Sequence, residues 1–288
     1  MEGIVLKYSK IVAPVVKWVG GKRQLLPEIR KYIPQKKYTL YYEPFLGGGA
    51  VLFDLQPLNA IVNDLNEELI NLYTVIKNDP DELIKDLKKH RNQSDYYYRI
   101  RELDRDRSKY RKLTDVERAS RIHYLNKTCF NGLFRVNRAG EFNTPFGRYK
   151  NPNITNEVTI RAVSKYFNKA NIEFRNVDFV EAVKDIDQNS FVYFDPPYDP
   201  VSDSANFTGY DKEGFDREEQ KRLKMLCDQL DERGISFLLS NSATAFIKDL
   251  YSDPSRNYQI EIIKAKRTIN SNANGRGEID EVLVRNYE

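Results

Sequence analysis

Residues 38–55 read YTLYYEPFLGGGAVLFDL, which places a strand, a glycine turn and a helix in succession. The segment YTLYYE has the composition of a strand and ends at Pro44, whereas AVLFDL, after three glycines, has that of a helix. A second apolar run, AIVND, ends on Asp64, and NEELINLYTVIK then has the spacing of an amphipathic helix. Glycines that allow close backbone approach, followed by an acid at the next strand end, are typical of a nucleotide site. The spacing is not G-x-G-x-x-G, so a pyrophosphate cradle is not indicated, and a plain tight turn stays open as the alternative.

The same alternation continues in the second half of the chain. The apolar runs IEFRNVDF, FVYFD and ISFLLSNS each lie next to a stretch with helical periodicity. Strands that alternate with helices predict a parallel sheet. The last two apolar runs, YQIEIIKAKRTI and EIDEVLVRNY, flank the polar loop NSNANGRG and predict an antiparallel hairpin at the sheet edge.

Residues 85–150 interrupt this alternation. Their first part, to about residue 127, is charged and helical in pattern, and the second contains FNGLFRVNRAGEFNTPFGRYK, which predicts a hairpin with long loops. The window has 18 Lys and Arg against 8 Asp and Glu, a local charge of +10, which leaves −6 for the rest of a chain whose net charge is +4. The small net charge therefore hides a basic segment suited to nucleic acid.

Composition excludes several classes of protein. With 288 residues and 40% hydrophobic content the chain can bury a normal core, so disorder is excluded. Cys129 and Cys227 have no metal-ligand spacing, which favours a reducing, cytoplasmic setting without a disulfide framework or a bound metal. No stretch approaches the roughly 20 apolar residues of a membrane span. His90 and His123 fall in the helical part of the insertion and receive no catalytic role.

Two short motifs carry the chemistry. In the tetrapeptide Asp195–Tyr198 (DPPY), at the end of an apolar strand, each proline removes an N–H and fixes φ, so the Asp carboxylate and nearby carbonyls are rigid acceptors suited to an amino group. The tyrosine can stack on a planar base. The alternative is a rigid turn with a surface tyrosine. In the second motif, KWVGGK, Trp18 could be a core anchor and the lysines simply solvated.

Six motifs occur in order along the chain: KWVGGK, EPFLGGG, NDLN, FNGLFRVN with GEFNTPFGRYK, DPPY, and NFTGY. Together they resemble a known family, the Dam-type DNA adenine-N6 methyltransferases of the alpha group, and most closely the subset that modifies GATC. The match runs from about Val16 to Tyr287. One departure is FLGGG in place of the GAGS ending of some members, which is conservative because glycine tolerates the same backbone.

The resemblance implies a Rossmann-like, mostly parallel seven-stranded methyltransferase sheet with an inserted helical target-recognition domain and hairpin. The catalytic domain would comprise residues 1–77 and 151–288, and the recognition domain residues 78–150. The implied cofactor is S-adenosylmethionine, which leaves as S-adenosylhomocysteine, with no metal. The residues matched to it are Trp18, Lys22, Gly47, Gly49, Asp64, Asp178, Phe179 and Asp195. Of these, Lys22 would lie near the methionine carboxylate, Asp64 at the ribose diol, and Asp178 and Phe179 at the adenine.

The implied reaction is direct methyl transfer to the N6 atom of an adenine flipped out of double-stranded DNA. Asp195 and the carbonyl of Pro196, followed by Pro197, would hold the N6 hydrogens, and Tyr198 would stack on the base. The residues matched to DNA are Lys17, Phe130, Asn131, Leu133, Arg135, Arg138, Pro145, Arg148, Tyr149 and Lys150. Among them Arg135 and Lys17 would contact guanines and Leu133 and Pro145 a thymine methyl, although these two could simply pack the hairpin. Arg138, Arg148 and Lys150 would meet phosphates.

A polar loop with Phe207, Tyr210 and Phe215 would close over the flipped base, with a plain surface loop as the alternative. The resemblance also implies a monomer, and a cognate restriction endonuclease would be a partner in function and not in a complex. Three other functions stay open at this point. Cytosine-N4 methylation uses a similar corner, but usually with Ser in place of Asp195. The intact motifs argue against an inactive DNA-binding module. The glycine spacing argues against an NAD oxidoreductase.

Overall fold

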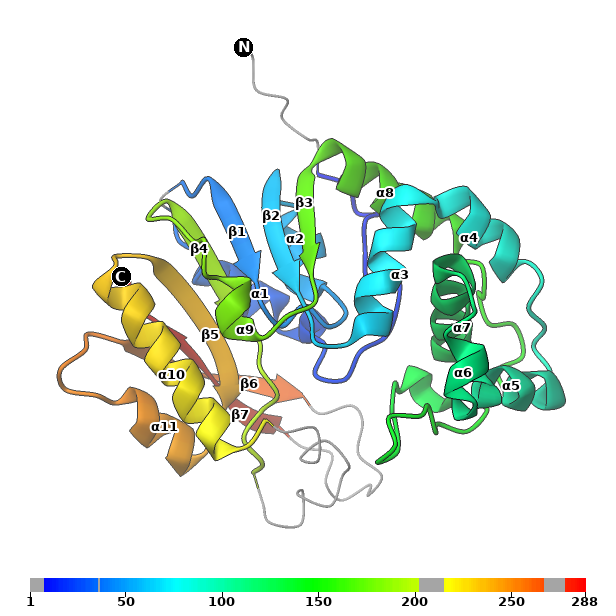
Figure 1. Ribbon diagram of the computed structural model, residues 1–288. Helices are drawn as coiled ribbons and strands as arrows, with labels where there is room; N and C mark the ends of the chain where they lie inside the picture. The colour runs from blue at the N-terminus through cyan, green and yellow to red at the C-terminus, as the bar shows by residue number, and fades with distance from the viewer. Residues whose placement is uncertain (1–7, 36, 202–214, 267–277) are drawn as a thin grey trace. The chain divides into compact units, whose positions relative to one another are not determined.

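The chain has a mixed α/β fold in a computed structural model that describes residues 8–35, 37–201, 215–266 and 278–288 (Figure 1). Its strands form a seven-stranded sheet in the order β3-β2-β1-β4-β5-β7-β6. The pairs β1–β4, β4–β5 and β2–β3 are parallel, and β7 is antiparallel to both β5 and β6. The predicted α/β class with a mostly parallel seven-stranded sheet is therefore confirmed. The strands are β1 (Leu40–Glu43), β2 (Asn59–Asn63), β3 (Asn171–Arg175), β4 (Ser190–Phe194), β5 (Ser236–Ser242), β6 (Gln259–Lys266) and β7 (Glu278–Arg285).

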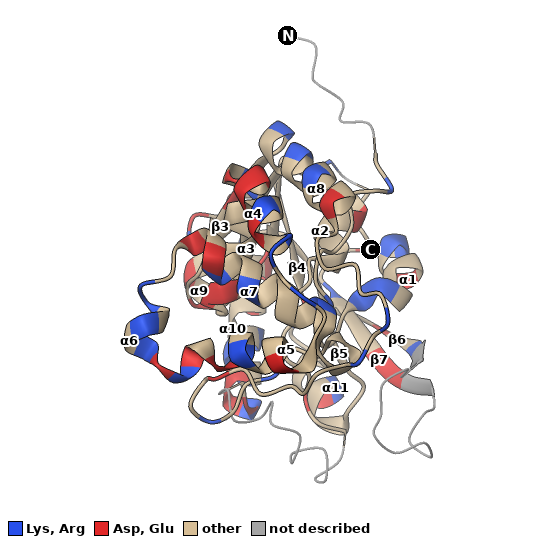
Figure 2. Cartoon of the chain, turned by 90° about the vertical axis from the view of Figure 1, so that its right-hand side faces the viewer, with Lys and Arg blue, Asp and Glu red and all other residues tan. Residues whose placement is uncertain are grey.

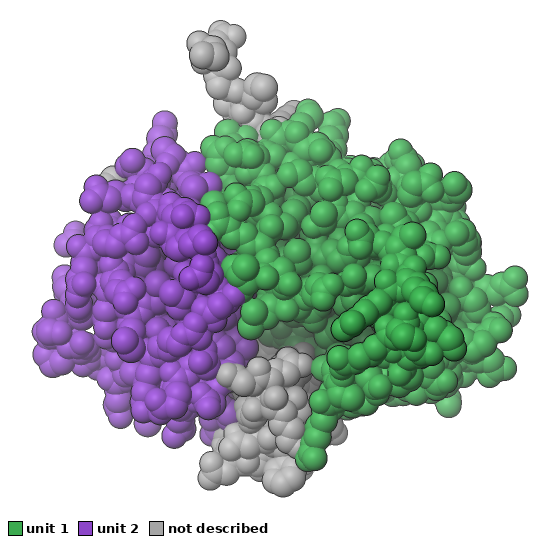
Figure 3. All heavy atoms as spheres, in the orientation of Figure 1, with its two compact units in different colours: residues 1–21, 46–177 green, residues 22–45, 178–288 purple. Residues whose placement is uncertain are grey.

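Two compact units make up the chain, one of residues 1–21 and 46–177 and the other of residues 22–45 and 178–288 (Figure 3). The first unit contains β2 and β3, and the second contains the other five strands. Residues 78–150, predicted as a recognition domain, all belong to the first unit, and the division into catalytic and recognition domains stays a prediction. Phe207, Tyr210 and the loop NSNANGRG lie outside the described residues.

The first unit forms around its parallel strand pair. Tyr73, on α3, packs against Phe53 and Phe167 at centroid distances of 6.0 and 6.1 Å, and all three side chains are buried. Asn66 begins α3 because its side chain accepts the Leu69 N–H at 3.0 Å. These helices are α2 (Ala50–Leu55), α3 (Glu67–Asn78) and α8 (Glu157–Lys169).

The inserted segment of the first unit is helical to Thr128, close to the predicted end near residue 127, and a short 3-10 turn then follows where the hairpin was predicted to begin. Its longest helix, α7, begins with a capping box in which Thr114 and Glu117 satisfy each other's backbone N–H groups. Figure 2 shows Lys and Arg residues on α6, and also along α8, which follows the segment. The segment contains α4 (Pro80–Leu87), α5 (Ser94–Arg101), η2 (Glu102–Arg105), α6 (Arg107–Tyr110), α7 (Asp115–Thr128) and η3 (Phe130–Gly132).

The second unit is built on β4, whose five residues are all buried. A strand buried on both faces is typical of the centre of a parallel sheet, and its continuous apolar sequence follows from that position. The helices of this unit are η1 (Lys22–Gln24), α1 (Leu26–Lys31), α9 (Phe179–Ala182), α10 (Arg217–Glu232) and α11 (Ala245–Tyr251). None of the described helices is long and apolar enough to cross a membrane.

Candidate active site and DNA-reading hairpin

The DPPY motif directly follows β4 in the second unit, and its aspartate is held by two side chains. The buried Lys22 places its Nζ 2.7 Å from Oδ1 of Asp195, and the Ser240 hydroxyl donates to the same oxygen at 3.0 Å. Burial raises the pKa of Asp195 above its ordinary value, although the charge of Lys22 and the two hydrogen bonds oppose that shift. A carboxylate fixed through one oxygen is a positioned acceptor for an N–H donor.

Tyr198 is oriented by the sheet as well. Its hydroxyl donates to Oε2 of Glu281 on β7 at 2.8 Å, and Lys22 Nζ lies 4.3 Å from the ring centroid. The carbonyl of Pro197 accepts from Gln220 on α10 at 2.8 Å. The strand-end motif is therefore tied to β5, β7 and α10, and is more than a surface turn with a tyrosine.

Asp178 and Phe179 begin α9 in the same unit. Asp178 accepts the Val180 N–H at 2.9 Å and pairs with Arg222, whose guanidinium carbon lies 4.5 Å from the Phe179 ring centroid. Burial works against ionisation, but the bonds from Arg222 and Val180 prevail and hold the pKa of Asp178 below its ordinary value. The Phe179 ring packs on Phe45 at 5.3 Å and on Phe215 at 5.8 Å.

The glycine turn belongs to the first unit. Gly47 has φ +48°, and a Cβ there would lie 2.9 Å from the Trp18 ring, so the turn and the indole are in direct contact. Gly49 also has a positive φ, +67°, and faces Phe53 in the same way. The requirement for glycine thus comes at least partly from packing within the protein.

Asp64, at the end of β2, accepts one backbone N–H on each carboxylate oxygen. The Gly47 N–H reaches Oδ2 at 2.8 Å and the Asn66 N–H reaches Oδ1 at 2.9 Å. A carboxylate at the end of a strand is an acceptor of the kind that ribose hydroxyl donors require. A nucleoside cofactor fits this set of residues: a strand-end acid, a glycine turn and an adjacent aromatic ring.

The predicted hairpin follows α7 in the first unit, and most of the residues matched to DNA are exposed on it. Phe130 is 54% exposed, and the Arg135 side chain points to solvent with its Nε bonded to Asn143 Oδ1 at 2.7 Å. Leu133 is half-buried. The other exposed members are Lys17, Asn131, Arg138, Pro145, Arg148, Tyr149 and Lys150.

Lys17 meets the base of this hairpin although the two are far apart in sequence. Asn126 on α7 accepts the Lys17 N–H at 2.8 Å and donates to the carbonyls of Lys17 and Gly132 at 2.8 and 3.2 Å. A Cβ on Gly132 would lie 2.6 Å from the Lys17 side chain. The structure therefore brings together the candidate base contacts of the N-terminal motif and of the insertion.

The histidines of the insertion have structural surroundings. His123 is fully buried, and burial lowers its pKa to about 3. His90 contacts the Tyr96 and Ser120 hydroxyls at 2.9 and 3.0 Å, and burial lowers its pKa to about 4. Both rings are neutral near pH 7. Within the described ranges, no group of three or more His, Cys, Asp or Glu side chains could hold a metal ion.

Several residues that bond the candidate site residues were not identified from the sequence. Ser240 and Glu281 bond Asp195 and Tyr198, and Asn143 bonds Arg135. Lys22 was identified, but for a cofactor carboxylate and not for its ion pair with Asp195. Asp104, which was not identified either, bonds the hairpin backbone at Phe142.

The chain is similar to known DNA methyltransferases over most of its length. The model of the family described as D12 class N6 adenine-specific DNA methyltransferase matches residues 18–269. The chain is 45% identical to the Type II methyltransferase M1.LlaDCHI of Lactococcus lactis subsp. cremoris, over 98% of this chain and 99% of that protein. It is 39% identical to the Type II methyltransferase M.MjaIII of Methanocaldococcus jannaschii, over 96% and 99%. The DNA adenine methylase of Escherichia coli (strain K12) is 34% identical over 93% of each chain.

Proposed function

The chain belongs to the D12 class of N6 adenine-specific DNA methyltransferases, and we propose that it methylates the adenine of double-stranded 5'-GATC-3' with S-adenosylmethionine as the methyl donor. The observation that carries the proposal is the Asp195–Tyr198 corner, in which the carboxylate is fixed by Lys22 and Ser240 and the ring by Glu281. A rigid acceptor beside a stacking ring is what an exocyclic amino group on a planar base requires.

The chemistry assigned to the corner is positioning and charge stabilisation. Asp195 accepts a hydrogen bond from the N6 amino group, with the Pro196 carbonyl as the second acceptor. Both bonds would draw the nitrogen lone pair out of conjugation with the ring, which makes the nitrogen a better nucleophile. Tyr198 stacks on the base, which must leave the duplex because N6 cannot be reached inside the stack.

The bound cofactor supplies an electrophilic methyl group. In the first unit, Trp18, Gly47, Gly49 and Asp64 would hold its nucleoside part, with Asp64 accepting from the ribose hydroxyls. In the second unit, the residues matched to the methionine and adenine groups are Lys22, Asp178 and Phe179. Lys22, which pairs with Asp195, is the cation matched to the methionine carboxylate.

Sequence recognition is assigned to the hairpin. Arg135 would read a guanine edge with its two terminal nitrogens, because Asn143 already holds Nε. Lys17 would contact a second guanine, Leu133 and Pro145 a thymine methyl, and Phe130 and Asn131 the space near the extruded base. Phosphate contacts would come from Arg138, Arg148 and Lys150, and Tyr149 is matched to DNA without a more specific role. We further propose that the enzyme is cytoplasmic and acts as a monomer. A cognate restriction endonuclease would be its partner in function and not in a complex.

The proposal is tested with S-adenosylmethionine labelled in its methyl group and two duplexes that differ only in whether they contain GATC. After digestion to nucleosides, label is expected in N6-methyladenine from the GATC duplex alone. Label in cytosine would support N4 methylation instead, and equal labelling of both duplexes would reject GATC. Asp195→Ala is expected to lose transfer while keeping cofactor and DNA binding, and unchanged turnover would overturn its role.

A further inference from the structure

The hairpin that carries Arg135 has little support of its own. Within the described residues its bridges are isolated pairs, Val136 with Phe142 and Cys129 with Phe146, outside any named strand. A lone two-stranded hairpin is marginally stable in water at best. A segment that places a guanidinium for base reading therefore needs bracing from elsewhere in the fold.

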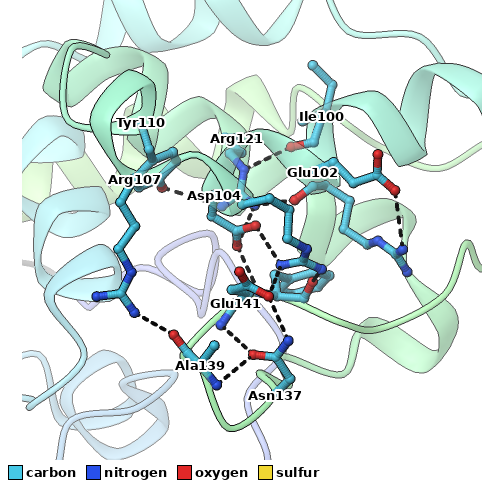
Figure 4. A network of polar contacts seen from close by, with 12 residues as sticks. Ile100, Glu102, Asp104, Arg107, Tyr110, Arg121, Asn137, Ala139 and Glu141 are labelled. Carbon is cyan, nitrogen blue, oxygen red and sulfur yellow. Dashed lines mark hydrogen bonds and ion pairs between the residues drawn. The ribbon is translucent and has the colours of Figure 1, made fainter.

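Three side chains of the insertion provide that bracing, and we call Asp104, Arg105 and Arg107 the hairpin clamp (Figure 4). Asp104 Oδ2 accepts the Phe142 N–H at 2.8 Å, and Arg105 donates to the Phe142 carbonyl at 2.7 Å. Arg107 donates to the carbonyl of Ala139 near the hairpin tip. The clamp thus binds backbone groups, which fix register whatever the side chains are.

Asp104 is itself firmly held. Arg121 and Arg105 each place a guanidinium nitrogen 2.8 Å from one of its oxygens, and its side chain is only 12% exposed. Arg121 is 6% exposed and donates to the carbonyls of Ile100 and Arg101 at 2.9 and 2.7 Å. A partly desolvated carboxylate with two arginine partners is a far more rigid anchor than a surface ion pair.

The clamp leads directly to Arg135. Phe142, the clamped residue, precedes Asn143, whose N–H donates to the Arg135 carbonyl at 2.9 Å and whose Oδ1 accepts Arg135 Nε at 2.7 Å. The Phe142 ring also packs on Phe134 at 5.6 Å. Asn143 therefore bonds both the backbone and the side chain of Arg135, and Asp104 holds the residue next to it, Phe142.

We propose that Asp104 is a positioning residue for sequence recognition, which sets the register of the hairpin through Phe142 and thereby the placement of the Arg135 guanidinium. It contacts neither base nor cofactor. The inference rests on the proposed function, in which Arg135 reads a guanine of GATC. Its signature is a loss of selectivity at the guanine that Arg135 reads.

The test is Asp104→Asn, which keeps the shape and removes the charge that holds Arg105 and Arg121. The measured quantity is kcat/KM on the GATC duplex divided by kcat/KM on a duplex in which one guanine is replaced, for each guanine in turn. A loosened bidentate contact is expected to lower this ratio about five- to tenfold at that guanine only, which is about 1 to 1.4 kcal/mol. Arg161→Met, which removes an arginine paired with Asp81 and Glu157, is the matched control with unchanged selectivity.

Arg105→Met is the second variant, because it releases the Phe142 carbonyl while Asp104 keeps Arg121. It is expected to shift the same ratio in the same direction, which keeps the inference testable if Asp104→Asn does not fold. Combining either change with Arg135→Ala is expected to add nothing at that guanine, since both act through one contact.

The outcomes separate the two levels of the proposal. If Arg135→Ala loses selectivity at one guanine while the folded clamp variants keep it, the positioning role is overturned and the proposed function stands. Equal loss at every position, or additive effects with Arg135→Ala, also overturns it, because that would mark a general loss of hairpin structure. If the unsubstituted protein does not discriminate GATC, the proposed function fails and takes this inference with it.

Discussion

The ion pair between Lys22 and Asp195 leads to a sharp prediction for Lys22→Met, which keeps the length of the side chain and removes its charge. Lys22 is 4% exposed and Asp195 20%, so the change leaves a mostly buried carboxylate without its cation. Breaking a buried pair in this way costs about 3 to 5 kcal/mol, and the partial exposure of Asp195 favours the lower end. That cost applies while Asp195 is ionised, and protonation of the carboxylate relieves it.

The expected result depends on pH in a defined direction. Burial already raises the pKa of Asp195 above that of an unfolded Asp, near 3.9, and the variant raises it further. The folded variant then binds the proton more tightly than the unfolded chain, so its loss of stability is full at neutral pH and shrinks as pH falls through the raised pKa. The acidic limb of kcat against pH moves to higher pH for the same reason.

The assay is urea unfolding at pH 7.5 and pH 5, together with kcat across that range. The double variant Lys22→Met/Asp195→Asn is expected to recover most of the stability at pH 7.5 and none of the activity, since a neutral pair no longer buries a lone charge. Lys31→Met, which breaks the exposed pair with Glu28, is the control with little change. An equal loss of stability at both pH values would refute the reasoning, because the effect would then come from packing and not from charge.

Three further outcomes are expected. Ser240→Ala removes a hydrogen bond that lowers the pKa of Asp195, so the acidic limb of kcat against pH should move to higher pH. The movement should be smaller than in Lys22→Met, and an acidic limb that does not move would contradict the prediction. Tyr198→Phe keeps the ring and loses the bond to Glu281, a charge-assisted bond of about 1.5 to 3 kcal/mol, so kcat should fall about tenfold with the KM for DNA little changed. Arg148→Ala should weaken binding equally on all sequences and reduce the salt slope by about one, and a loss confined to GATC would mark it as a base contact.

The fold could be largely predicted because its signals are local. The strand and helix in residues 38–55 appear as β1 and α2, and the run that ends at Asp64 appears as β2. Each of these segments carries its own periodicity and its own terminator, such as Pro44 or the glycines. The antiparallel hairpin of β6 and β7 was predicted from the same kind of pattern and is confirmed.

The supporting contacts of the site could not be predicted in this way. Ser240 lies 45 positions from Asp195, and Glu281 lies 83 positions from Tyr198. Asp104 lies 38 positions from Phe142. Ser, Glu and Asp at such separations resemble ordinary polar residues of a strand or a solvated turn, since only the register of the sheet or the docking of the hairpin brings them to their partners.

The place of β7 in the sheet has a consequence for biosynthesis. It is the last described strand to leave the ribosome, yet it lies between β5 and β6 and pairs with both. Until it emerges, β5 has an open edge of unpaired amide and carbonyl groups on a buried strand, which is the state most prone to mispairing with another chain. Because Glu281 is carried on β7, the nascent chain also cannot orient Tyr198 before that moment. The orientation of Tyr198 and the protection of the β5 edge therefore both depend on β7.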